Sequence, residues 1–262
     1  MFQTHEDINI SKNYLKNGFI VFDVKDRKKL DDLRSDVINF FRKQTKNTKI
    51  KMSDDEFLNK AHKFIDKKKL NIFRLNLINY LNSKSKFRIS YFSFAKDYLE
   101  KIVGNELAMQ QKLNLSIQLP KDNSSLLPLH SDTWSGDSPF ETVVWLPLVN
   151  CYKTKTMYIV PPNKMKFLND QIKKNISTDK LFAKVKKYVK WIKINYGQIL
   201  IFNQNLPHGN VVNLENQTRW SFNCRFKSIF APYGDKKIGE FFEPITLKPA
   251  SKLGMIYKYP KI

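Results

Sequence analysis

The chain has 262 residues, with 46 lysine and arginine against 24 aspartate and glutamate residues, and its formal net charge is +22 at pH 7. A hydrophobic content of 42% and an aromatic content of 13% are typical of a folded protein, so long disordered segments are not expected. No apolar run approaches the roughly 18 residues of a membrane-spanning helix, and the N-terminal region lacks the apolar core of a signal peptide. We therefore expect a soluble, cytoplasmic protein whose residues 1–262 form a single domain with no membrane span.

The basic charge predicts attraction of anionic partners but does not by itself indicate nucleic acid. Only seven of the 46 basic residues are arginine, and no basic stretch is interleaved with aromatic residues, as single-strand binding requires. We expect no dedicated nucleic-acid site. A preference for anionic small substrates and a merely lysine-rich composition both stay open, as does the oligomeric state. The two cysteines, Cys151 and Cys224, do not form a disulfide framework, which favours a reducing compartment.

The first 104 residues are predicted to be mainly helical. They begin with a polar leader over residues 1–16, followed by an apolar run of strand length at residues 18–23. We expect the helices that follow to buttress one sheet of a β-sandwich. Apolar residues recur at helical spacing in four segments: residues 26–47, 53–65, 69–82 and 90–103.

Short β-rich segments follow over residues 105–230, which we expect to form the core of the fold. Alternation over residues 107–119 puts Asn114 and Gln118 on a polar strand face. Either side chain could hydrogen-bond a bound ligand, and the alternative is a solvated sheet face. Residues 142–149 and 155–160 are apolar runs whose spacing predicts a hairpin.

The rest of the chain contains an insertion, a long alternating strand and an extension. Residues 164–190 have roughly helical spacing and are expected to pack outside the β core. Residues 218–226 alternate polar and apolar side chains, so that one strand face must meet polar partners. Residues 231–262 are a C-terminal extension that we expect to be irregular.

Three residues form a candidate metal site. His130 and Asp132 are two positions apart, so in an extended chain both side chains point to one face and can bind the same ion. His208 follows another strand and can complete the triad. Two imidazoles and one carboxylate on one face of an octahedral ion leave adjacent positions open, as in non-heme Fe(II) oxygenases.

An anion clamp is expected next to this metal. Arg219 and Ser221 share a strand face eleven residues after His208, and could bind the far carboxylate of 2-oxoglutarate through a guanidinium and a hydroxyl. Arg225 lies on the same face but lacks the serine partner, so we expect it to contact the substrate or to form an ion pair.

These five residues, His130, Asp132, His208, Arg219 and Ser221, resemble the signature of the Fe(II)/2-oxoglutarate-dependent oxygenases. The resemblance implies a double-stranded β-helix (a cupin-like jelly roll) with N-terminal buttressing helices, and a reaction in which Fe(II), 2-oxoglutarate and O2 oxidise a small molecule while succinate and CO2 are released. Segments at residues 138–141, 145–149 and 156–161 are similar to a branch found in carbohydrate and aminoglycoside gene clusters, the streptomycin-biosynthesis type. Thr156 replaces the serine of that branch but keeps its hydroxyl, so the resemblance implies a role in co-substrate binding.

The expected activity is therefore a 2-oxoglutarate-dependent dioxygenase that hydroxylates a small polar or anionic carbohydrate-type metabolite. Loops beside a metal commonly select the substrate, and Trp134 and Asp137 on the loop after Asp132 are candidate contacts, together with Arg225. Two alternatives stay open. A cupin-like metal-dependent sugar isomerase or epimerase would not need Arg219 and Ser221, and a non-catalytic basic binding protein would leave the triad without a role.

Overall fold

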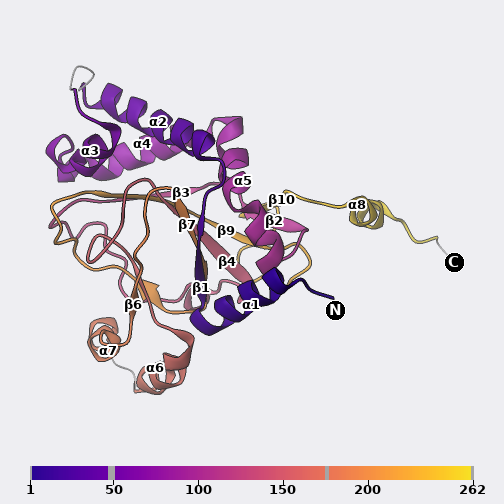
Figure 1. Ribbon diagram of the computed structural model, residues 1–262. Helices are drawn as coiled ribbons and strands as arrows, with labels where there is room; N and C mark the ends of the chain where they lie inside the picture. The colour runs from indigo at the N-terminus through magenta and orange to yellow at the C-terminus, as the bar shows by residue number, and fades with distance from the viewer. Residues whose placement is uncertain (1, 47–50, 175–176, 261–262) are drawn as a thin grey trace.

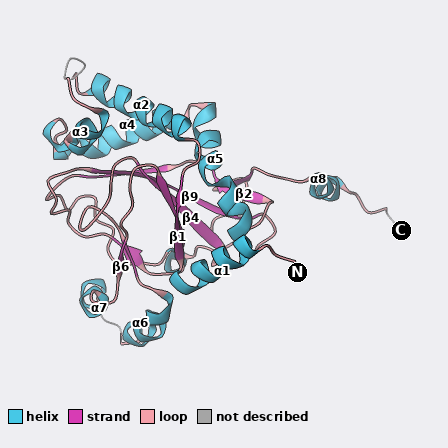
Figure 2. Ribbon diagram, viewed as in Figure 1, coloured by secondary structure: helices cyan, strands magenta, loops and turns pink. Residues whose placement is uncertain are grey.

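The computed structural model describes residues 2–46, 51–174 and 177–260 (Figure 1). Helices and antiparallel strands occupy separate layers, and this confirms the predicted α+β class (Figure 2). The main sheet has the order β1-β7-β4-β9-β2-β10, with β3 also paired to β9, and a smaller sheet has the order β6-β5-β8. The main-sheet strands are β1 (Phe19–Asp23), β2 (Leu107–Gln110), β3 (Asn114–Gln118), β4 (Glu141–Pro147), β7 (Gln198–Asn203), β9 (Arg219–Ser228) and β10 (Phe242–Pro244). Those of the smaller sheet are β5 (Tyr158–Ile159), β6 (Lys190–Trp191) and β8 (His208–Gly209).

Strand β9 is the structural centre of the main sheet, since β2, β3 and β4 all pair with it. Its apolar face packs against the N-terminal helices: the ring of Trp220 lies 5.4 Å from that of Phe41, and the ring of Phe222 lies 5.3 Å from that of Phe87. The opposite, polar face of β9 is thereby turned toward the interior between the two sheets. The helices before β2 are α1 (His5–Asn17), α2 (Arg27–Gln44), α3 (Asp54–Asn59), α4 (Leu70–Asn82) and α5 (Ser85–Ile102).

Helix α1 lies in the segment for which the sequence predicted only a polar leader. The hydroxyl of Thr4 accepts a hydrogen bond from the Asp7 amide, and Asp7 accepts one from the Thr4 amide, which is a capping box. Gly18 ends the helix with φ of 76°, a conformation in which glycine carries no steric penalty. Ile10 is its one buried residue, so the helix has no wide apolar stripe that a periodicity search could detect.

The predicted hairpin of residues 142–149 and 155–160 is wrong. All seven residues of β4 are buried, and β4 pairs on its two sides with β7 and β9 rather than with β5. Strand β5 lies in the smaller sheet between β6 and β8. The intervening residues carry the chain from one sheet to the other, because β4 already has a partner along each edge.

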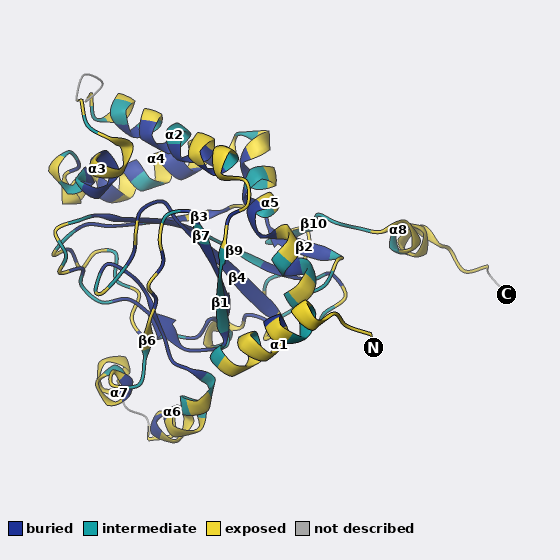
Figure 3. Ribbon diagram, viewed as in Figure 1, coloured by how far each residue is buried: buried dark blue, intermediate teal, exposed yellow. Residues whose placement is uncertain are grey.

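The insertion at residues 164–190 contains α6 (Met165–Ile172) and α7 (Thr178–Val185). Both pack on the smaller sheet, where Leu168 and Leu181 join a buried cluster with Tyr158. Beyond β9, the extension contains β10 and α8 (Pro249–Ile256), so it is more regular than the sequence predicted. Helix α8 projects from the body, and none of its residues is buried (Figure 3). Within the described ranges, no helix is both long and apolar enough to cross a membrane.

Candidate active site

The two candidate histidine ligands face each other across a β-bridge. The amide of His130 donates to the carbonyl of His208 at 3.0 Å, and the amide of His208 donates to the carbonyl of His130 at 2.8 Å. Directly opposed residues of an antiparallel pair carry their side chains on the same side. The bridge therefore brings the imidazoles together, with ring centroids 4.4 Å apart, although the two residues are 78 positions apart in the sequence.

Both imidazoles present their Nε2 lone pair to the same space. Nδ1 of His130 lies 2.7 Å from the Pro128 carbonyl, and Nδ1 of His208 lies 2.8 Å from the Leu206 carbonyl. A carbonyl can only accept, so each Nδ1 carries the proton and each Nε2 is free to bind a metal. Burial, and then the neighbouring His130, lower the pKa of His208 to about 4, so the ring is neutral near pH 7.

Asp132 supplies the carboxylate of the group. One ligand atom from each of His130, Asp132 and His208 can be chosen so that all three lie within 4.8 Å of one another. One carboxylate oxygen of Asp132 lies 3.6 Å from Nε2 of His130, and the other lies 3.0 Å from Nη2 of Arg225. The donor set of two imidazoles and one carboxylate suits a non-heme iron site of the facial-triad type.

Glycine follows His208 because its Cα is in close contact with two other segments. A Cβ at Gly209 would lie 2.6 Å from the Leu127 carbonyl oxygen and 2.7 Å from the hydroxyl of Tyr158. A larger residue at this position would push apart the segments that carry His130 and His208, and would therefore separate the two imidazoles.

Arg219 lies in the interior as a buried cation without an acidic partner. It is 3% exposed, and among the described residues no carboxylate forms an ion pair with it. Nη1 donates to the Thr156 carbonyl at 3.2 Å, and Nη2 donates to the Ser116 hydroxyl at 3.0 Å. Burial lowers the pKa of the guanidinium to about 10, which leaves it charged at pH 7. A buried, uncompensated charge is costly, so the site favours an anionic ligand.

Several orphaned polar atoms surround this guanidinium. The buried hydroxyls of Ser221 and Thr156, the side-chain oxygen of Gln118 and Nε of Arg219 itself all lack a hydrogen-bond partner within the described residues. Ser221 is two positions from Arg219 on one strand face, and Gln118 is the cross-strand neighbour of Arg219. Buried polar groups in folded proteins are almost always paired, so this concentration of unpaired atoms points to a polar ligand.

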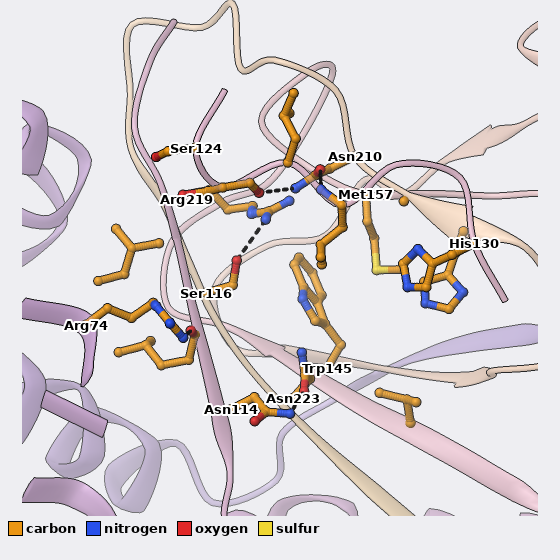
Figure 4. Close-up of a pocket in the computed structure, with 18 of the residues that line it drawn as sticks. Arg74, Asn114, Ser116, Ser124, His130, Trp145, Met157, Asn210, Arg219 and Asn223 are labelled. Atoms are coloured by element: carbon orange, nitrogen blue, oxygen red, sulfur yellow. Dashed lines mark hydrogen bonds between the residues drawn. The ribbon is translucent and has the colours of Figure 1, made fainter. Parts of the chain in front are cut away.

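One cavity of about 550 Å³ extends from the three candidate metal ligands to Arg219 (Figure 4), and Gln118, Thr156 and Ser221 do not line it. His130, Asp132, His208 and Arg219 all line it. Apolar side chains, including the buried Trp145, form much of its wall. Its size is that of a pocket for a drug-sized ligand, which exceeds the needs of a five-carbon dicarboxylate alone.

Of the three residues predicted to contact the substrate, Trp134, Asp137 and Arg225, only Arg225 lines the cavity. Trp134 is 47% exposed and Asp137 is buried, and neither lines the cavity. Asp137 accepts a hydrogen bond from Lys236 at 2.6 Å and lies 3.4 Å from Arg225. Arg225 does line the cavity, but its charge is paired with Asp132 and Asp137, so its position is that of a residue that orients a candidate metal ligand.

Sequence reasoning missed several lining residues. Trp145 lies within an apolar run, where its contribution to a cavity cannot be distinguished from ordinary core packing. Arg74 comes from α4, which was predicted only as a buttress, and Asn210 comes from the loop after β8. The alternation over residues 107–119 did carry a signal, since Asn114 also lines the cavity and donates to Asn223 at 3.0 Å.

No family model matches the sequence, and no curated protein does. Solved structures do match. The nickel complex of the non-heme monooxygenase ThoJ has a TM-score of 0.58 at 13% identity, over 92% of this chain and 85% of ThoJ. HygX from Streptomyces hygroscopicus, solved with nickel and 2-oxoglutarate, has a TM-score of 0.51 at 12% identity, over 88% of this chain and 89% of HygX. The α-ketoglutarate-dependent carbocyclase SnoK from nogalamycin biosynthesis has a TM-score of 0.52 at 12% identity, over 94% of this chain and 97% of SnoK.

The chain shares the fold of these non-heme enzymes. Identities this low show the fold alone, so the activity has to be argued from the residues of the cavity.

Proposed function

We propose that the protein is an Fe(II)- and 2-oxoglutarate-dependent oxygenase built as one double-stranded β-helix domain, with buttressing helices before it. The observation that carries this proposal is the pairing, within one cavity, of a two-histidine, one-carboxylate group with a buried arginine that has no acidic partner. The first feature suits iron and the second suits an anion. The nickel and 2-oxoglutarate in HygX support the same pair of ligands for this fold.

His130, Asp132 and His208 would hold the metal. The Nδ1 protons of the two histidines are already donated to carbonyls, so neither imidazole has to change its tautomer before binding. When bound there, Fe(II) with 2-oxoglutarate would supply the oxidising chemistry, in which O2 is consumed, succinate and CO2 are released, and a substrate C–H bond is oxidised.

Arg219 would bind the 5-carboxylate of 2-oxoglutarate and fix its orientation. Its unpaired Nε and the free hydroxyl of Ser221 can donate to the carboxylate. The hydroxyl of Thr156 is a further donor, and Gln118 can take part through an ordered water, because its free atom is an acceptor. The apolar wall around Trp145 would exclude bulk water from the reacting centre.

For the substrate, we propose a small polar or anionic molecule of carbohydrate type, and hydroxylation as the reaction. The branch resemblance and the surplus of cationic side chains in the cavity support this choice. The absence of disulfides supports a cytoplasmic location, since both Cys151 and Cys224 are buried free thiols. A cupin-like isomerase or epimerase that does not bind 2-oxoglutarate is less well supported, because the buried, unpaired Arg219 would then have no anion to bind.

The test is succinate release by the purified protein with Fe(II), 2-oxoglutarate and O2, first alone and then with a panel of sugars, nucleotide sugars and aminoglycosides. The proposal expects succinate formation that depends on Fe(II) and is stimulated by members of this panel. Stimulation only by lipids, peptides or free amino acids would overturn the substrate class. No Fe(II)-dependent consumption of 2-oxoglutarate with any compound would overturn the activity itself.

A further inference from the structure

We propose that the outer end of the cavity is a phosphoryl subsite, in which Lys67 and Arg74 bind a phosphate group carried by the substrate. This inference rests on the proposed function and deepens it, because it names the chemical class of the substrate. No part of the site that would hold the metal or 2-oxoglutarate contributes to it.

Lys67 lies in the short 3-10 helix Lys67–Lys69, which directly precedes α4. Arg74 lies in the N-terminal part of α4 itself. Lys67, Asn71 and Arg74 are spaced by four and three residues, so they lie along one helix face, and all three line the cavity. In the view of Figure 4, Arg74 lies on the far side of Arg219 from His130. A ligand that reaches from the metal ligands to this helix would span the cavity.

Among the described residues, no carboxylate forms an ion pair with Lys67 or Arg74. In the part of the chain that the structure describes, four lysine and arginine side chains line the cavity. Arg225 is paired with Asp132, and Arg219 is assigned to the co-substrate, so Lys67 and Arg74 are the two that are available to the substrate. Nζ of Lys67 donates to the Lys121 carbonyl at 3.0 Å, so its existing partner is neutral. The cavity lining within the described residues contains one acidic side chain, Asp132.

Arg74 is likewise held by neutral groups. Nη2 donates to the side-chain oxygen of Asn71 at 2.8 Å, and Nη1 lies 3.4 Å from the Leu115 carbonyl. These bonds orient the guanidinium and leave further N–H donors. The acidic residue of the neighbouring loop, Asp122, accepts hydrogen bonds from the amide and hydroxyl of Ser124 and does not line the cavity.

Two cations that line the same cavity favour a dianion over a monoanion. A phosphate monoester carries close to two negative charges at neutral pH and several acceptor oxygens, whereas a carboxylate carries one charge and two oxygens. An arginine fork combined with a lysine point charge is a common arrangement for phosphate recognition. The mixed wall between this end and the metal ligands, with Trp145 and Asn223, suits a ring that is apolar on its faces and polar at its edges.

Inorganic phosphate is the probe. It is titrated by calorimetry at constant ionic strength into the Fe(II) protein, anaerobically and with saturating 2-oxoglutarate, so that Arg219 is already occupied. Arg74→Ala and Lys67→Ala should each weaken phosphate binding by about tenfold or more, because each removes a charge-assisted hydrogen bond. Lys69→Ala removes the same charge from an exposed position that does not line the cavity, and it should change the dissociation constant by less than about threefold. Arg74→Gln tests the same loss with less change in side-chain volume.

A second titration, of 2-oxoglutarate, separates this inference from the proposed function. If 2-oxoglutarate binds but phosphate binding is absent, or falls equally in Lys69→Ala and Arg74→Ala, the subsite is wrong and the co-substrate site stands. If phosphate binding depends on Arg74 but 2-oxoglutarate does not bind, the subsite stands and the proposed function fails. Acetate that binds the wild type as tightly as phosphate would overturn the phosphoryl assignment.

Discussion

Arg225 and Asp132 form an ion pair that uses one oxygen of the candidate metal-binding carboxylate and leaves the other facing His130. Nη2 of Arg225 lies 3.0 Å from one oxygen, while the other lies on the side of His130, 3.6 Å from its Nε2. Arg225 is itself held by a hydrogen bond of 3.0 Å from its Nε to the side-chain oxygen of Gln204. The arginine therefore fixes the orientation of Asp132 and leaves one oxygen for a metal.

Replacing Arg225 should weaken metal binding without removing a ligand. Arg225→Ala leaves Asp132 free to rotate, and losses of this kind typically cost about 10- to 100-fold in metal affinity. Competition between the protein and a chelator for Fe(II) under anaerobic conditions measures the effect. Arg88→Ala is a matched control, because it removes an arginine–glutamate pair outside the cavity. Equal iron affinity of Arg225→Ala and wild type would show that the pair does not orient Asp132.

The three candidate ligands can be tested by iron stoichiometry. His130→Ala, Asp132→Ala and His208→Ala should each abolish tight binding of one Fe(II) per chain, and their circular dichroism spectra should stay unchanged. His62→Ala is the control, because His62 hydrogen-bonds Thr218 and does not line the cavity. Stoichiometric iron retained by a His130→Ala, His208→Ala double variant would exclude this site.

Lys155 should make the free energy of unfolding of the protein depend on pH in the alkaline range. Its ammonium is buried and donates to Asn59 at 2.5 Å and to Gln217 at 2.9 Å, and burial lowers its pKa to about 8. The unfolded chain keeps this proton up to a pH near the usual lysine pKa, so between these two values it binds more protons than the folded chain. The contribution of Lys155 to stability therefore rises with pH in this window, by about 1.4 kcal/mol for each pH unit.

Lys155→Met should remove this part of the pH dependence. Urea unfolding at pH 8 and at pH 10 measures the change in the free energy of unfolding for wild type and variant. The gain between the two pH values should be smaller in Lys155→Met than in wild type. Lys69→Met, an exposed lysine, should behave like wild type. An identical gain in all three proteins would mean that Lys155 does not titrate differently in the folded state.

Much of the fold could be predicted from the periodicity of apolar residues, because burying one face of a helix or strand imposes that periodicity on the sequence. The alternation over residues 218–226 places Trp220 and Phe222 against the helices and Arg219 in the interior, as strand geometry requires. Helix α1 was missed because capping by Thr4 and Gly18, rather than an apolar stripe, defines it. The strand partners of β4 could not be predicted, because a continuous apolar run that is buried on both faces does not specify which strands pair along its edges.

The candidate site shows the same division. His130, Asp132 and His208 could be selected from their residue types and spacing, because metal chemistry restricts both. The role of Arg225 as a partner of Asp132 depends on a contact across 93 positions of sequence, for which local spacing gives no signal. Arg74 lies on a helix whose periodicity predicts only packing, and its position at the cavity comes from how α4 docks beside β3.

On the proposed function, the cavity holds Fe(II) and 2-oxoglutarate together, with Arg219 as the anion partner. Titration of 2-oxoglutarate into the anaerobic Fe(II) protein, followed by the metal-to-ligand absorption band, tests it most directly. The wild type should develop the band, and Arg219→Ala should bind roughly 30-fold to several thousand-fold more weakly, because it leaves a carboxylate unpaired in a largely dry site. Arg219→Lys should lie between them, since it keeps the charge but loses the planar fork, and iron affinity should be equal in all three proteins. Arg219→Ala that bound 2-oxoglutarate as tightly as wild type, while iron-saturated Arg225→Ala did not, would contradict the assignment and make Arg225 the clamp.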